Sequence, residues 1–157
     1  MDIEYIDSNT GKVFKQQIDD PDQSFWDFLA SFECTEKQLQ SKIDSLDISA
    51  DKKAILSSLN KITFTAGRFV IKIGKKIIDV IFSLLKNFPY LGFGVIFGLV
   101  LGALISAIPL IGAALGAIAT TITVALGVTL GGLEEYKSGD LRVRIDRFVK
   151  DLSPLNS

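Results

Sequence analysis

The chain has no histidine and a single cysteine, Cys34, among its 157 residues. Without histidine, it cannot carry out histidine-dependent acid–base catalysis, and it cannot build Ser-His-Asp or Cys-His nucleophiles or the usual zinc sites. One cysteine also provides no disulfide framework. The acidic cluster at residues 19–22 is better explained as a helix-capping turn than as a cation site. We therefore expect a protein that is not an enzyme and that binds no metal ion and no cofactor.

The chain also has a long stretch without charge: no Asp, Glu, Lys or Arg occurs in residues 87–133. A helix of that length reaches about 70 Å, more than twice the roughly 30 Å hydrocarbon core of a bilayer. Pro109 lies near the middle, where its ring and missing N–H break a helix. The sequence predicts a transmembrane hairpin in residues 88–133, with helices near 89–108 and 111–132. The link around Pro109 has no charged group, so a hairpin that enters the bilayer without fully crossing it is an open alternative.

Small residues recur at every fourth position of this hairpin, giving each helix a stripe of small side chains. In lipid, such stripes let helix backbones approach closely, and a mid-helix glycine otherwise costs up to about 1 kcal/mol relative to alanine. The stripes either join the hairpin to itself, join copies into a homo-oligomer, or pack the core of a soluble protein. The predicted packing residues are Gly94, Gly98, Gly102, Gly112, Gly116, Gly127 and Gly131. The residues available to line a pore are Ser106, Thr120 and Thr123.

The net charge of −1 conceals a strong segregation of charge along the chain. Residues 1–47 contain eleven acids and four lysines, a balance of −7, whereas residues 61–86 contain six cations and one acid, a balance of +5. The basic segment adjoins the apolar stretch and carries no nucleic-acid-binding motif. We therefore expect a lipid bilayer with an anionic leaflet as partner, and no nucleic acid.

Residues 63–87 are predicted to form the basic element, an amphipathic helix that starts at Phe64. Its polar positions are separated by three or four residues and lie along one face. Such a helix lies in the interface of an anionic leaflet, where each cation contributes about 1 kcal/mol. A pore-lining or partner-binding helix is the alternative. The predicted membrane-surface residues are Arg68, Lys72, Lys75, Lys76 and Lys86.

Two further regions flank the membrane segments: an acidic soluble region at residues 1–62 and an amphipathic helix with its tail at 134–157. The first region begins with a predicted β-hairpin at residues 2–19, and short helices follow it. Capping residues are Asp22 or Ser24 for the first helix, Thr35 within a capping box for the second, and Ser49 for the third. The helical stripe of Phe25, Phe28 and Phe32 is either core or a binding surface for a protein partner.

The uncharged hairpin from Tyr90 to Leu133, rich in Ala, Gly, Leu and Ile and preceded by a lysine-rich amphipathic segment, resembles the hydrophobic hairpin of colicin-type pore-forming domains. In that family the hairpin inserts into the bacterial inner membrane, and amphipathic helices complete an ion-conducting pore. This chain is shorter, lacks the receptor-binding and translocation regions, and starts with a predicted β-hairpin. Its composition is also similar to that of secreted bacterial effectors that anchor in host membranes.

Topology follows from the cations before the hairpin, which keep that flank in the cytoplasm. Two crossings then place both termini in the cytoplasm of a cell whose inner membrane holds the protein. The first residues, Met1 to Glu4, carry acids where a signal peptide has a basic region, so we expect insertion to rely on the internal stretch.

The fold class predicted from these features is a mainly α membrane protein with a two-helix glycine-zipper hairpin. The leading functional hypothesis is a small oligomeric membrane protein that forms a pore or channel, or otherwise permeabilises a membrane. The alternative is a membrane-anchored adaptor whose N-terminal region recruits a protein partner. A third hypothesis is a soluble protein that conceals the hairpin until it is triggered.

Overall fold

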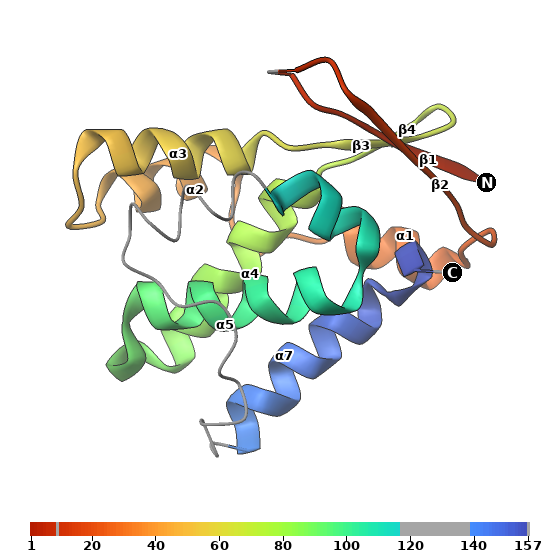
Figure 1. The fold of residues 1–157 in the computed structure, drawn as a ribbon. Helices are drawn as coiled ribbons and strands as arrows, with labels where there is room; N and C mark the ends of the chain where they lie inside the picture. Colours follow the sequence, from red (N-terminus) through yellow and green to blue (C-terminus); the bar gives the residue numbers. More distant parts are fainter. Residues whose placement is uncertain (9, 117–138, 157) are drawn as a thin grey trace.

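The computed structural model describes residues 1–8, 10–116 and 139–156. The described chain is mainly helical, as predicted, and contains one small antiparallel sheet (Figure 1). The strands are β1 (Asp2–Ile6), β2 (Val13–Gln17), β3 (Phe64–Ala66) and β4 (Phe69–Ile71). The helices are α1 (Gln23–Ala30), α2 (Glu36–Asp44), α3 (Ala50–Asn60), α4 (Ile73–Asn87), α5 (Gly92–Ala107) and α7 (Gly139–Asp151), with 3-10 turns at Pro89–Leu91 and Ser153–Asn156.

The sheet has the strand order β2-β1-β3-β4, and every neighbouring pair is antiparallel. The predicted N-terminal β-hairpin is confirmed, with Asp2 opposite Gln17 at one end of the β1–β2 ladder. Ile3 and Tyr5 alternate along β1 and are buried, because successive side chains of a strand point to opposite faces. The inner strand β1 therefore anchors the sheet to the core.

Helix caps follow the sequence prediction closely. The Asp22 side chain accepts the Phe25 N–H, and the Ser49 side chain accepts the Lys52 N–H. Thr35 and Gln38 form the predicted capping box, in which each side chain binds the backbone N–H of the other residue. These local bonds satisfy N–H groups that the first helical turn leaves unpaired.

The predicted basic helix is wrong over its first nine residues, since α4 begins at Ile73 and not at Phe64. Residues 64–71 form instead the hairpin of β3 and β4, which turns at Gly67 with a φ of +62°. A two-residue hairpin turn needs such a positive φ, and glycine adopts it without strain. Phe64 and Ala66 alternate into the core, where a strand and not a helix places them.

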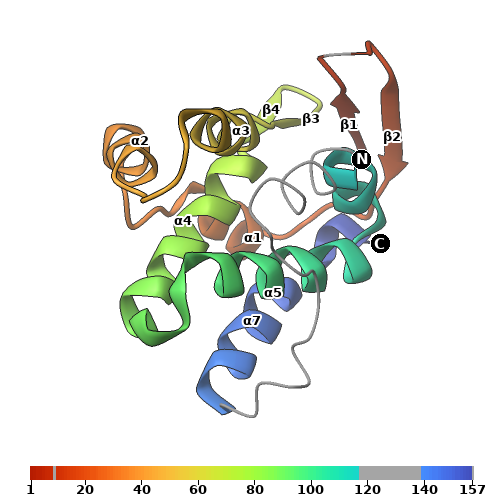
Figure 2. The same cartoon turned by 60° about the vertical axis from the view of Figure 1, so that its left-hand side comes forward.

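Helix α5 lies between α4 and α7 in both views of the fold (Figures 1 and 2). The predicted break at Pro109 is confirmed, because α5 ends at Ala107 and a new helical stretch covers residues 109–116. The second predicted membrane helix otherwise lies outside the described residues. Among those described, Pro89–Ala107 is the one segment long and apolar enough to cross a membrane, a test that a buried core helix also passes.

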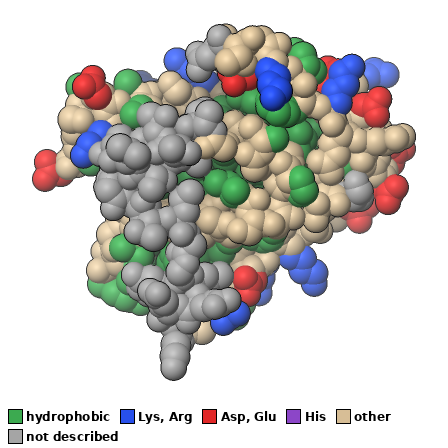
Figure 3. Space-filling view, in the orientation of Figure 1, with side chains coloured by type: hydrophobic (Ala, Val, Ile, Leu, Met, Phe, Trp, Pro, Cys, Tyr) green, Lys and Arg blue, Asp and Glu red, His purple; other side chains and the backbone are tan. Residues whose placement is uncertain are grey.

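The core of the molecule runs along α5. Ile96, Phe97, Val100 and Leu104 have no exposed surface, and α7 packs on this helix and buries Leu141, Ile145 and Phe148. In the space-filling view, charged side chains lie around the rim and apolar side chains appear between them (Figure 3). The most apolar described helix thus packs against two amphipathic ones and buries eight of its 16 residues.

Candidate functional site

The small-residue stripe of α5 is mostly inside the fold. Gly98 and Gly102 are buried and Gly94 is half-buried, whereas Ser106 at the end of the helix is exposed. Of the second stripe, Gly112 lies close to the Ile105 carbonyl, and Gly116 is exposed. The remaining predicted residues, Thr120, Thr123, Gly127 and Gly131, lie outside the described residues. In this conformation, Gly98 and Gly102 are packed in the fold and are not available to a second copy.

The polar face of α4 holds the two charged side chains that are buried in the described part of the chain, Lys76 and Asp79. They are 4% and 3% exposed, although the sequence predicted that Lys76 lies at a membrane surface. The segment that covers them is the loop of residues 31–35 between α1 and α2. An uncompensated buried charge is strongly destabilising, so the contacts of this loop decide how the charges are held.

Asp79 binds the loop through both of its carboxylate oxygens. Its Oδ2 accepts the Glu33 N–H at 2.9 Å, and its Oδ1 accepts the Cys34 N–H at 2.9 Å. Helix α2 begins directly after this contact, with Thr35 as its N-cap, so the carboxylate also lies beside the positive end of that helix. Two charge-assisted hydrogen bonds therefore fix the loop to α4.

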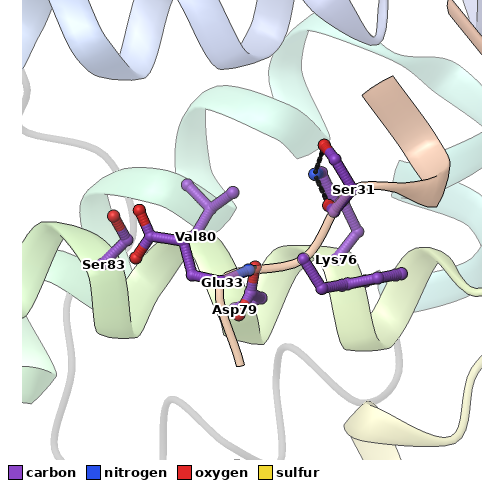
Figure 4. Close-up of a pocket in the computed structure, with 7 residues that line it drawn as sticks. Ser31, Glu33, Lys76, Asp79, Val80 and Ser83 are labelled. Carbon is purple, nitrogen blue, oxygen red and sulfur yellow. Dashed lines mark hydrogen bonds between the residues drawn. The ribbon is translucent and has the colours of Figure 1, made fainter. Parts of the chain in front are cut away.

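Lys76 binds the same loop from the preceding turn of α4. Its ammonium donates to the Ser31 carbonyl and, at 3.4 Å, to the Ser31 Oγ, as the dashed lines in Figure 4 mark. The Phe28 and Phe32 rings lie 4.2 Å and 5.3 Å from the ammonium, within cation–π range. Burial lowers the pKa of Lys76, and the negative charges of Asp79, Asp151 and Glu33 oppose that shift.

Together the loop of residues 31–35, Lys76 and Asp79 form a unit that we call the clasp. It borders a pocket of about 310 Å³, lined by Ser31, Phe32, Glu33, Lys76, Asp79, Val80 and Ser83. A lysine with a lowered pKa beside a carboxylate is a pattern also found in acid–base sites. Here, however, both charged groups are bound by the backbone of one loop, which accounts for them as a structural fastening.

The other predicted surface residues separate into two groups. Arg68, Lys72 and Lys86 are exposed, whereas Lys75 is half-buried with its ammonium 4.2 Å from the centre of the Phe32 ring. The five cations therefore do not form the single membrane-surface face of a helix that was predicted: α4 begins too late to carry Arg68, and the loop of residues 31–35 covers Lys76.

The phenylalanine stripe is also divided. Phe25 is buried in the core, Phe28 is half-buried beside Lys76, and Phe32 lies beyond the end of α1. These rings cover α4, so the core interpretation accounts for them in this conformation.

Sequence reasoning missed the role of Asp79 and of its loop partners. One signal was present, since Asp79 is the only acid between residues 61 and 86. The loop that binds it, however, lies 45 and 46 positions earlier in the sequence. Comparison of the chain with protein-family models, curated proteins and solved structures finds no match. The function is therefore argued from the site itself.

Proposed function

We propose that the protein permeabilises a membrane and that the fold described above is its closed form. The observation that carries this proposal is that α5, the helix apolar enough to span a bilayer, lies in the core behind α4 and α7. On contact with a membrane, α5 and the apolar residues after it leave this core and enter the lipid. The amphipathic helices then remain at the interface.

The free energy of exposure explains why the closed form stays closed in water. Five side chains of α5 (Ile96, Phe97, Val100, Leu101 and Leu104) are at most 1% exposed. Burial of one such side chain contributes about 1.5–3 kcal/mol, so exposing all five to water costs on the order of 10 kcal/mol. Hydrocarbon is as apolar as the core, so the same helix enters a bilayer without that cost. The membrane is therefore the condition that makes opening favourable.

The clasp is the polar barrier to this change. It fixes α4 to the N-terminal region through Lys76 and Asp79, and α4 is one of the two helices that pack on α5. In the opening that we propose, α4 separates from α5 and moves relative to the loop of residues 31–35, which breaks the clasp. Opening then frees Gly98 and Gly102, so assembly of copies through the glycine stripe follows release and does not precede it.

Dye release from liposomes tests the proposal. Vesicles with anionic lipid and an entrapped self-quenching dye should release it on addition of the wild-type protein. Gly116→Leu is the informative variant, because Gly116 is exposed and an added Cβ meets no atom of the described residues within 4 Å. The closed form should keep its stability, measured by urea denaturation, while release falls at least tenfold. If the wild-type protein releases no dye at any pH or membrane potential tested, the proposal is wrong.

A further inference from the structure

The β3–β4 hairpin carries two large apolar side chains on the surface. Phe69 is 51% exposed and Val70 is 60% exposed. They belong to β4, which is an edge strand of the sheet and is only three residues long. At least half of each side chain is exposed to solvent, and adjoining exposed apolar side chains of this kind are typical of an interaction surface.

The only tryptophan in the chain extends this apolar surface from the neighbouring helix. Trp26 of α1 stacks on Phe69, with ring centroids 4.8 Å apart and an interplanar angle of 27°. Between α1 and β4 lies an open groove of about 340 Å³, lined by Trp26, Leu29, Ala30, Phe32, Phe69, Val70, Ile71 and Lys72. The groove and the hairpin thus form one continuous apolar surface.

Cations frame this surface. Arg68 and Lys72 are exposed at the two ends of β4, and no acid occurs in residues 61–78, which hold five cations. An anionic leaflet is complementary to this arrangement, with phosphates for the cations and an apolar interior for the rings. Tryptophan is also the residue enriched at membrane–water interfaces. A strand-adding peptide fits less well, because three residues of edge offer few main-chain hydrogen bonds.

We infer that the β3–β4 hairpin and Trp26 form the surface on which the closed protein docks to an anionic membrane. Phe69 and Val70 enter the interface, while Arg68 and Lys72 bind lipid phosphates. This inference rests on the proposed function and adds a step before it. Docking also reaches the clasp, because Phe32 lines both the groove and the clasp pocket and its ring contacts the Lys76 ammonium.

Trp26 reports docking directly, because its fluorescence is the sole tryptophan signal of the chain. Flotation and emission spectra should be recorded with vesicles of phosphatidylcholine alone and with added phosphatidylserine. We expect binding to the anionic vesicles, a blue shift of the emission, and quenching by lipids with brominated acyl chains. Phe69→Ser with Val70→Ser should weaken binding at least tenfold, and Arg68→Ser with Lys72→Ser about thirtyfold.

Matched controls change similar groups elsewhere on the surface. Ile6→Ser with Val13→Ser removes another exposed apolar pair, 57% and 48% exposed, and Lys12→Ser with Lys37→Ser removes the same charge. Both controls should bind like the wild type. The inference is overturned if the hairpin variants bind as tightly as the controls, or if bound protein shows unshifted Trp26 emission. A dimer in solution that Phe69→Ser dissolves would also overturn it.

Dye release on the same vesicles separates this inference from the proposed function. Docking with a blue-shifted Trp26 but without dye release supports the docking surface and refutes permeabilisation. Dye release that Phe69→Ser with Val70→Ser leaves unchanged, at unchanged binding, refutes the docking surface and leaves permeabilisation standing. Circular dichroism of each variant shows whether the closed fold persists. Arg68→Ser with Lys72→Ser changes only exposed side chains, so it tests the docking surface even if Phe69→Ser with Val70→Ser disturbs the fold.

Discussion

Replacing Asp79 by asparagine should weaken the clasp without altering the shape of its side chain. The carboxylate accepts two backbone N–H groups, from Glu33 and Cys34, one on each oxygen. An asparagine has one oxygen and one NH₂ group, so one of these donors then faces another donor. The substitution also removes a negative charge whose field favours the ammonium of Lys76.

The magnitude follows from the two bonds. A hydrogen bond to a charged group contributes about 1.5–3 kcal/mol, and a neutral one about 1 kcal/mol. Loss of one bond and weakening of the other give about 3 kcal/mol, which is a large part of the 5–15 kcal/mol typical of a domain. If the clasp opens locally, the same free energy corresponds to about a hundredfold faster amide exchange at Glu33 and Cys34.

Two assays check this prediction: urea denaturation followed by circular dichroism, and hydrogen–deuterium exchange resolved at the loop of residues 31–35. Asp27→Asn serves as the control, since Asp27 is exposed on α1 and accepts a hydrogen bond from the Gln23 side chain one turn earlier. It should change the free energy of unfolding by less than about 0.5 kcal/mol. An Asp79→Asn protein with control-like stability and unchanged exchange at Glu33 and Cys34 would refute the clasp.

Two further predictions concern α4. Gly74→Ala should lower the free energy of unfolding by about 3 kcal/mol, because the new Cβ would lie 1.9 Å from the Leu59 carbonyl oxygen. Gly139→Ala is the control. Its Cβ meets no described atom within 4 Å, so the free energy of unfolding should stay nearly unchanged. Equal urea midpoints for these two variants would contradict the close approach of α3 and α4. Burial lowers the pKa of Lys76 below its usual 10.5, so at a pH between these two pKa values the folded chain has released a proton that the unfolded chain retains. Stability from this group therefore rises with pH across that window. Lys76→Met should abolish this rise of the free energy of unfolding with pH, measured by urea denaturation up to pH 10.5. If the variant keeps the pH dependence of the wild type, the lowered pKa of Lys76 is refuted.

Local signals in the sequence were sufficient for much of the fold. The caps at Asp22, Thr35 and Ser49 depend on residues within three positions of each other, and all three form as predicted. The break at Pro109 is equally local, because proline lacks the N–H that the helix needs. The apolar face of α7 follows from its helical period.

The error at residues 64–71 shows where local pattern fails. A three- or four-residue spacing of cations favoured a helix, although Phe64 and Ala66 alternate and Gly67 marks a turn. Strand β1 decides between these two patterns, because it pairs with Thr65 and Ala66 although it lies about sixty positions earlier in the sequence. The same applies to the clasp, since the partners of Asp79 and Lys76 come from a loop that sequence spacing does not connect with α4. The docking surface was predicted only for its cations, not for Trp26 and Phe69.

The pairing of β1 with β3 has a mechanical consequence for opening. Ile3 lies opposite Ala66, so the chain between them is a closed ring, and the loop of residues 31–35 is near the middle of that ring. In the proposed opening, the loop of residues 31–35 separates from α4 but stays near it, because both ends of the segment that contains the loop remain paired in the sheet. Its return is therefore an intramolecular step at high effective concentration, slowed little by chain entropy. Opening in water without a membrane should therefore be brief and reversible.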